Sequence, residues 1–62
     1  MKREWLIAFR KAKALSQQDV ANALNVPQTT YASWELGTRR PKPNKAKEIS
    51  IIFKFEWTKF YE

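Results

Sequence analysis

The segment from Ser16 to Gly37 constrains the fold of this chain more than any other, because two short helical patterns stand there only three residues apart. Ser16 has the chemistry of a helix N-cap, and Asp19, three residues later, completes an acidic form of the capping box. Apolar residues then recur at helical spacing at Val20, Ala21 and Leu24. We therefore predict a helix over residues 17–24 that buries this apolar face.

The residues between the two patterns are typical of a tight turn. Asn25 tolerates the left-handed conformation better than most residues other than glycine, and Pro27 suits the first turn of a following helix, where its missing N–H costs nothing. A second helix is predicted over residues 28–36, and the only glycine of the chain, Gly37, stands where a C-cap favours one. Two short helices joined by a tight turn form a helix-turn-helix when the second is exposed.

The remaining segments are also predicted to be helical. A first helix fits residues 4–14 and a further helix fits residues 44–53, each with apolar side chains at helical spacing. Proline keeps the basic loop between the third and fourth helices from being helical, and residues 55–62 add a last short helical turn. We therefore predict an all-α fold of five short helices over residues 1–62, a single domain.

The composition excludes several classes of function. The chain has no cysteine and no histidine, which removes disulfides, thiolate nucleophiles, zinc fingers and imidazole acid–base groups. Its few carboxylates are scattered, so we expect no enzymatic activity, no metal, no cofactor and no small-molecule ligand. The longest apolar run is far too short to span a bilayer, and basic residues interrupt the N-terminal stretch that a signal peptide needs. We expect a cytoplasmic protein.

The charge of the chain indicates a polyanionic partner. A net charge of +6 and a pI of about 10.0 favour nucleic acid or an anionic membrane surface. Yet residues 15–37 hold only two charged side chains, Asp19 and Glu35, and both are acidic. The basic residues flank this segment, at Arg10, Lys11 and Lys13 before it and at Arg39, Arg40, Lys42 and Lys45 after it.

The expected outer face of the third helix suits the reading of DNA bases. In a helix over residues 28–36 this face presents Gln28, Thr29, Ala32, Ser33 and Leu36. The major groove offers donors, acceptors and thymine methyl groups, and a glutamine amide suits adenine. An ordinary polar surface is the alternative, but Thr and Ser are mediocre helix formers, which favours readout. Charge placed elsewhere then supplies the affinity.

In this order and spacing, the stretch LSQQDVANALNVPQTTYASWELGTRRP resembles the phage repressor/Cro-type, or Xre, family of helix-turn-helix proteins. The resemblance continues upstream and downstream and covers nearly the whole chain. It implies a compact five-helix, repressor-like DNA-binding domain with the helix-turn-helix formed by helices 2 and 3. The matching residues are Ser16, Gln17, Val20, Ala21, Leu24, Val26, Glu35, Gly37 and Pro41, with Leu6, Phe9 and Arg10 before them and Ile49, Phe53, Phe55 and Phe60 after them.

The resemblance also implies roles for individual residues. It places base reading on Gln28, Thr29 and Ser33, with Ala32 nearby, and it pairs Glu35 with Arg10 in a partly buried ion pair. A phosphate contact falls on Gln17, whose position at a helix N-terminus attracts anions. Leu36 replaces an asparagine that often contacts the backbone in the family, and Thr38 or Arg39 could compensate. The full set expected at the DNA backbone is Gln17, Arg10, Thr38, Arg39, Arg40, Lys42 and Lys45.

The C-terminal aromatic residues have two readings. Most aromatic side chains are most simply core, but a chain this small can leave some uncovered, and exposed apolar surface marks an interface. Members of the resembled family often dimerise through this region, so we expect a homodimer that binds a palindromic operator, with half-sites about one helical turn apart. The expected dimer surface is Phe55, Trp57, Phe60 and Tyr61.

We therefore expect sequence-specific binding to double-stranded DNA by a transcriptional regulator, a repressor of phage or mobile-element type, without membrane association. An alternative is a protein-interaction module, antitoxin-like or antirepressor-binding, that uses the aromatic C-terminal surface. Such an activity would survive replacement of Gln28 and Ser33 by alanine. A third reading, electrostatic binding to anionic lipid, requires neither sequence preference nor a polar third helix.

Overall fold

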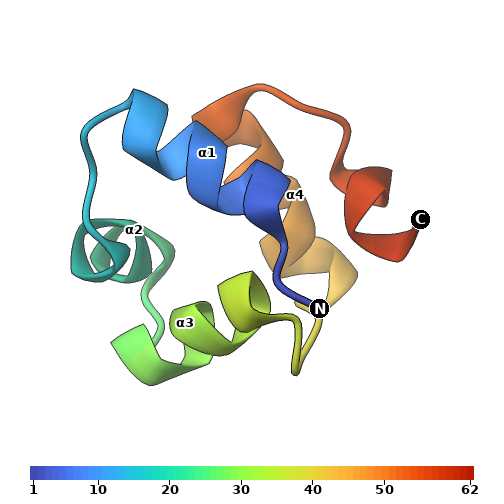
Figure 1. Cartoon of the computed structure of the whole chain (residues 1–62), viewed down its shortest axis with the longest axis horizontal. Coiled ribbons are helices and arrows are strands. Elements are labelled where there is room, and N and C mark those ends of the chain that lie inside the picture. The colour runs from blue at the N-terminus through green and yellow to red at the C-terminus, as the bar shows by residue number, and fades with distance from the viewer.

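The computed structural model describes all 62 residues and contains only helices and turns. Its elements are α1 (Glu4–Ala12), α2 (Gln17–Leu24), α3 (Gln28–Leu36), α4 (Pro43–Phe53) and the 3-10 helix η1 (Trp57–Tyr61) (Figure 1). The all-α prediction is confirmed. The count of five helices is wrong in its last member, because residues 57–61 form a single short 3-10 segment after four α-helices, as is common for runs too short for an α-helix.

One apolar core joins all five elements. α2 packs on α3 and α4, α1 crosses α3, and η1 packs on α4 (Figure 1). This arrangement leaves α3 along one side of the molecule, with its outer face unpacked. The core consists of Leu6, Val20, Ala21, Leu24, Tyr31, Trp34, Ala46, Ile49, Phe53 and Phe60.

Local chemistry explains most helix boundaries. Ser16 accepts a hydrogen bond from the Asp19 N–H at 3.0 Å, and its own N–H donates to Asp19 Oδ2 at 2.9 Å, which is the predicted capping box. Asn25 ends α2 in the left-handed conformation with φ of 61°, and Gly37 does the same for α3 with φ of 82°. Pro27 occupies the N-cap of α3 rather than its first turn.

The bounds of three elements differ from the sequence prediction, and one of them is η1, which spans residues 57–61 where 55–62 were expected. α1 ends at Ala12, two residues early, because Ala14 takes a left-handed conformation with φ of 55°. α4 begins at Pro43, one residue early, because a proline at the first helical position already has a helical φ and needs no N–H. None of the helices combines the length and the apolar character needed to cross a membrane.

Candidate nucleic-acid interface

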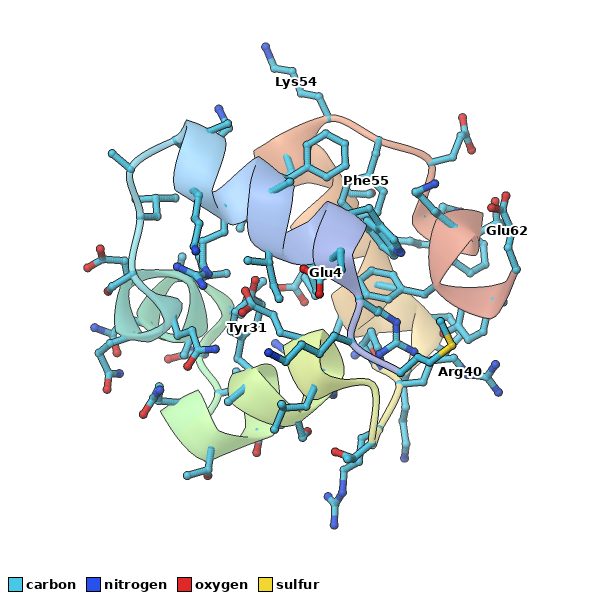
Figure 2. All side chains as sticks on the ribbon, in the orientation of Figure 1. Glu4, Tyr31, Arg40, Lys54, Phe55 and Glu62 are labelled. Carbon is cyan, nitrogen blue, oxygen red and sulfur yellow. The ribbon has the colours of Figure 1, made fainter.

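The outer face of α3 carries polar and small side chains, while its inner face is part of the core. Tyr31, Trp34 and Glu35 are buried, and Tyr31 points inward between α2 and α3 (Figure 2). The outer residues are Thr29 and Leu36, which are exposed, and Gln28, Ala32 and Ser33, which are half-buried. The five residues expected on this face therefore do share it.

Glu35 is the one buried charge of the molecule, and it joins three helices. Arg10 Nε donates to Glu35 Oε2 at 2.6 Å and Arg10 Nη2 donates to Oε1 at 3.2 Å. Gln17 Nε2 adds a third bond, to Oε1 at 2.9 Å. The ion pair expected from the sequence is thus present as a two-bond fork, and α1, α2 and α3 meet at a single carboxylate.

The surroundings of Glu35 favour its charged form. Burial alone would raise the pKa of Glu35, but the hydrogen bonds from Arg10 and Gln17 outweigh burial and leave that pKa below its ordinary value of 4.5. The bond to Glu35 likewise raises the pKa of Arg10. Burial, with the nearby Glu35 carboxylate, raises the pKa of Tyr31. An acid on α3 therefore does not repel DNA, because its charge is compensated inside the protein.

Gln17 connects this network to the outer face of α3. Its Oε1 accepts a hydrogen bond from Gln28 Nε2 at 2.8 Å. This bond orients the Gln28 side chain and uses one of its two amide hydrogens. Gln28 keeps one N–H and its Oε1, the donor and the acceptor that a bidentate contact to adenine requires.

Ser33 is oriented by a bond within its own helix. Its Oγ donates to the Thr30 carbonyl at 2.6 Å, so the hydroxyl hydrogen is already used. In this rotamer the oxygen lone pairs remain, and Ser33 can act as an acceptor towards an adenine or cytosine amino group.

The basic residues expected at the DNA backbone are not all on the side of α3. Arg39 lies beside α3, where it lines a shallow hollow of about 250 Å³ together with Thr29, Thr30 and Ser33. Lys42 is exposed in the loop, and Thr38 is exposed and donates through Oγ1 to the Ser33 carbonyl at 3.3 Å. All three residues are exposed, and their contact with the DNA backbone stays a prediction.

Three other cations have partners inside the protein. Arg10 is bound to Glu35 and donates through Nη1 to the Leu15 carbonyl at 2.9 Å. Lys45 Nζ donates to the Leu24 carbonyl at 2.7 Å, where it neutralises the C-terminal end of α2, and it also contacts Glu48. Arg40 stacks over the Tyr61 ring, 4.8 Å from its centroid. Arg10, Arg40 and Lys45 thus have partners within the protein, and their contact with the DNA backbone stays a prediction.

One basic residue has a role that the sequence did not indicate. Arg3 precedes α1 and looks like an ordinary solvated charge, yet its Nη1 donates to the carbonyls of Trp34 at 2.6 Å and Arg39 at 2.8 Å. Its backbone N–H also donates to the Glu35 carbonyl at 2.8 Å. No local pattern signals these contacts, because their partners lie more than thirty residues away.

The C-terminal aromatic residues, which were expected to form a dimer surface, are more buried than such a surface needs to be. Phe60 is 3% exposed and packs against Trp5, with ring centroids 5.1 Å apart, so it belongs to the core and its assignment to an interface is wrong. Phe55 and Trp57 are half-buried. Tyr61 is 36% exposed, and its hydroxyl donates to the Pro41 carbonyl at 2.7 Å.

Comparison with known proteins agrees with this geometry. The sequence profile of a helix-turn-helix family matches residues 6–60. The chain is 37% identical to YqaF of Bacillus subtilis (strain 168), named as an uncharacterized HTH-type transcriptional regulator, over 100% of this chain and 82% of that protein. No solved structure matches the chain significantly. From its packed α2–α3 unit, its exposed α3 and this match over most of its length, the chain belongs to the Xre-type helix-turn-helix family.

Proposed function

We propose that this protein regulates transcription by binding double-stranded DNA in a sequence-specific way, as a repressor of phage or mobile-element type. α3 enters the major groove in this proposal, and Gln28, Thr29, Ala32 and Ser33 contact the bases. Gln17, Thr38, Arg39 and Lys42 contact the flanking backbone. Gln17 contributes through its remaining amide hydrogen and through the free N–H at the start of α2.

The observation that carries this proposal is the fixed orientation of a charge-free outer face. The chain from Glu35 through Gln17 to Gln28 connects the buried ion pair to the amide at the surface. A side chain held in one rotamer loses less entropy when it binds a base. A helix surface that faces only solvent does not require side chains held in one rotamer.

The distribution of charge supports the same proposal. α3 has no basic residue, while the loop after it carries the exposed side chains of Arg39 and Lys42. Phosphate contacts of this kind supply affinity without sequence preference. Base contacts on α3 then supply the preference. No cofactor or small molecule has a part in this function, and we propose a cytoplasmic location.

Selection from a random duplex pool, followed by sequencing of the retained DNA, tests the proposal. The wild type should enrich a defined motif, and the double variant Gln28→Ala, Ser33→Ala should lose that enrichment while it keeps weak binding to any duplex. Each base contact removed should cost about 1–3 kcal/mol of discrimination. Binding without enrichment by the wild type would overturn sequence-specific recognition.

A matched control exists on α4. The Ser50 Oγ donates to the Lys47 carbonyl at 2.6 Å, the same i to i−3 bond that Ser33 makes on α3. Ser50→Ala therefore removes an equivalent hydroxyl from a helix that is not proposed to touch DNA. This variant should enrich the same motif as the wild type.

We also propose that two copies bind a palindromic operator. The apolar side chains that stay accessible support self-association: Phe55 and Trp57 of the expected surface are half-buried and Tyr61 is 36% exposed, and Ile51 on α4 is 75% exposed. An inverted repeat in the selected motif, with half-sites about one helical turn apart, is the expected result. A motif with a single half-site would exclude a dimeric complex. The double variant Gln28→Ala, Ser33→Ala also separates this proposal from the protein-interaction alternative, because that alternative activity would survive the two replacements.

A further inference from the structure

Arg3 joins three segments that are far apart in the sequence. Its guanidinium bridges the Trp34 carbonyl, near the end of α3, and the Arg39 carbonyl, in the following loop. The same guanidinium lies over the Phe60 ring, with Cζ 5.4 Å from the ring centroid. The core thus supports Arg3 on one side, and the loop carbonyls fix it on the other.

The loop that Arg3 contacts is tightly folded onto the end of α3. The N–H groups of Gly37, Thr38 and Arg39 all donate to the Ser33 carbonyl, at 3.1, 3.2 and 3.3 Å. Arg3 closes this turn from outside, because it holds the carbonyl of Arg39 at a fixed distance from that of Trp34. The backbone of Arg39 is therefore constrained at both its N–H and its carbonyl.

The N-terminal segment fits closely against the same turn. A Cβ atom at Gly37 would lie 1.8 Å from the Met1 carbonyl oxygen, so only glycine allows this approach. The N-terminus ends beside the C-terminal end of α3 (Figure 1). Residues 1–3 therefore form a strap across the α3–loop junction, with Arg3 as its anchor.

The side chain positioned by this turn faces a polar hollow. Arg39 supplies a guanidinium, and Thr29 and Thr30 supply hydroxyl groups, whereas the Ser33 hydroxyl hydrogen is held by the Thr30 carbonyl. No carboxylate and no apolar residue lines the hollow. A guanidinium beside hydroxyl groups suits a phosphate group.

We propose that Arg3 is a positioning residue that fixes Arg39 for contact with a DNA backbone phosphate at this hollow. The proposal rests on the DNA-binding function proposed above and adds a residue that does not itself touch DNA. Both carbonyl bonds come from one terminal nitrogen, Nη1, while the guanidinium lies over the Phe60 ring. Arg3→Met therefore removes both hydrogen bonds and keeps an unbranched side chain against the ring.

The test measures the affinity for a short duplex of mixed sequence between about 50 and 200 mM salt. The slope of log K against log salt reports the number of phosphate contacts. Arg39→Ala should reduce the slope of log K against log salt by about 1, as expected for one lost phosphate contact. Arg3→Met should reduce the slope by a similar amount, although Arg3 does not itself touch DNA in this proposal. In the Arg39→Ala background, Arg3→Met should have no further effect.

Lys54→Ala is the control for loss of one positive charge. Lys54 ends α4 on the side of the molecule away from α3 (Figure 2), so its removal should leave the slope nearly unchanged. A folded Arg3→Met variant with the wild-type slope would overturn the inference, and so would effects of Arg3→Met and Arg39→Ala that add. Absence of any duplex binding by the wild type would overturn the proposed function as well, so the two failures are distinguishable.

A second measurement uses the unmodified protein and does not depend on the stability of a variant. Nitrogen NMR of the arginine side chains follows each guanidinium while duplex is added. The Arg39 guanidinium resonances should shift, and those of Arg3 should keep the slow rotation of a hydrogen-bonded group in both states. A direct shift of Arg3 without one of Arg39 would overturn the assignment of roles.

Discussion

Ala14 has a backbone conformation that its side chain disfavours. Its φ of 55° lies in the left-handed region, where a Cβ atom costs about 1–2 kcal/mol. The residue is exposed and ends the turn between α1 and α2, so the strain serves the chain reversal rather than packing. Local strain of this kind is a liability in a domain of 62 residues, because such domains are only marginally stable.

Replacement of Ala14 by glycine should therefore stabilise the protein. We expect Ala14→Gly to raise the free energy of unfolding in urea by up to about 1 kcal/mol. Ala8 is the matched control, since it is exposed within α1, and Ala8→Gly should lower the same free energy by about 1 kcal/mol. Changes of the same sign in the two variants would show that Ala14 is not strained.

The hydroxyl of Tyr31 is buried close enough to the Glu35 carboxylate to affect its pKa, but it makes no hydrogen bond of good geometry. Burial of an unpaired hydroxyl is unfavourable, so Tyr31→Phe should leave the free energy of unfolding unchanged or raise it. Tyr61→Phe is the contrasting variant, because it removes the bond to the Pro41 carbonyl and should cost about 1 kcal/mol. Thermal unfolding of both variants tests this prediction. A larger loss of stability for Tyr31→Phe than for Tyr61→Phe would contradict it.

Among the helices, α3 depends most on a single polar side chain of its own. Glu35 is 2% exposed and connects α3 to α1 through Arg10 and to α2 through Gln17. The bond from Gln28 to Gln17 connects the proposed reading face to this junction. The network thus couples the stability of the helix packing to the geometry of the proposed reading face.

Removal of the Glu35 charge should loosen this junction. Glu35→Gln leaves the guanidinium of Arg10 without a counter-charge, which should cost about 3–5 kcal/mol at neutral pH, as measured by urea unfolding. Glu48→Gln is the control, because its contact with Lys45 is largely exposed and should be worth less than about 1 kcal/mol. Equal losses in the two variants would show that burial of the pair has no importance.

The same comparison has a defined pH dependence. Since the pKa of Glu35 is lowered on folding, its contribution is fully present above the ordinary value of 4.5 and is lost as the pH falls through the lowered value. The difference between the wild type and Glu35→Gln should therefore shrink in acid. Hydrogen bonds from Ser16 also lower the pKa of Asp19, but that effect is common to both proteins and cancels in the comparison.

At the scale of the whole molecule, charge and recognition occupy different places. All 12 basic side chains lie outside α3, whose outer face is neutral. Four other cations pack against aromatic rings of the protein itself: Arg3, Arg40, Lys47 and Lys59. These contacts cover aromatic surface that a core of this size cannot enclose. Arg39 and Lys42 are exposed in the loop that follows α3, and Arg39 lines the hollow beside that helix.

Sequence alone determined the helices that form the helix-turn-helix. The bounds of α2 and α3 follow from Ser16, Asn25 and Gly37, whose effects on the backbone are local and depend on near neighbours only. The composition of the outer face of α3 follows from helical spacing in the same way. The boundary errors at Ala12 and Pro43 are of one or two residues, because fraying and proline geometry are decided within a single turn.

Only the tertiary structure decided which charged side chains face a ligand. Arg3 reaches Trp34 and Arg39, and Lys45 reaches Leu24, across 21 to 36 positions of the chain. A long side chain finds such a carbonyl only after the helices have packed, and no spacing along the chain encodes that distance. The burial of Phe60 was decided in the same way, by the ring of Trp5 brought against it. Local chemistry therefore determines the helices, and packing determines which of their charges remain free.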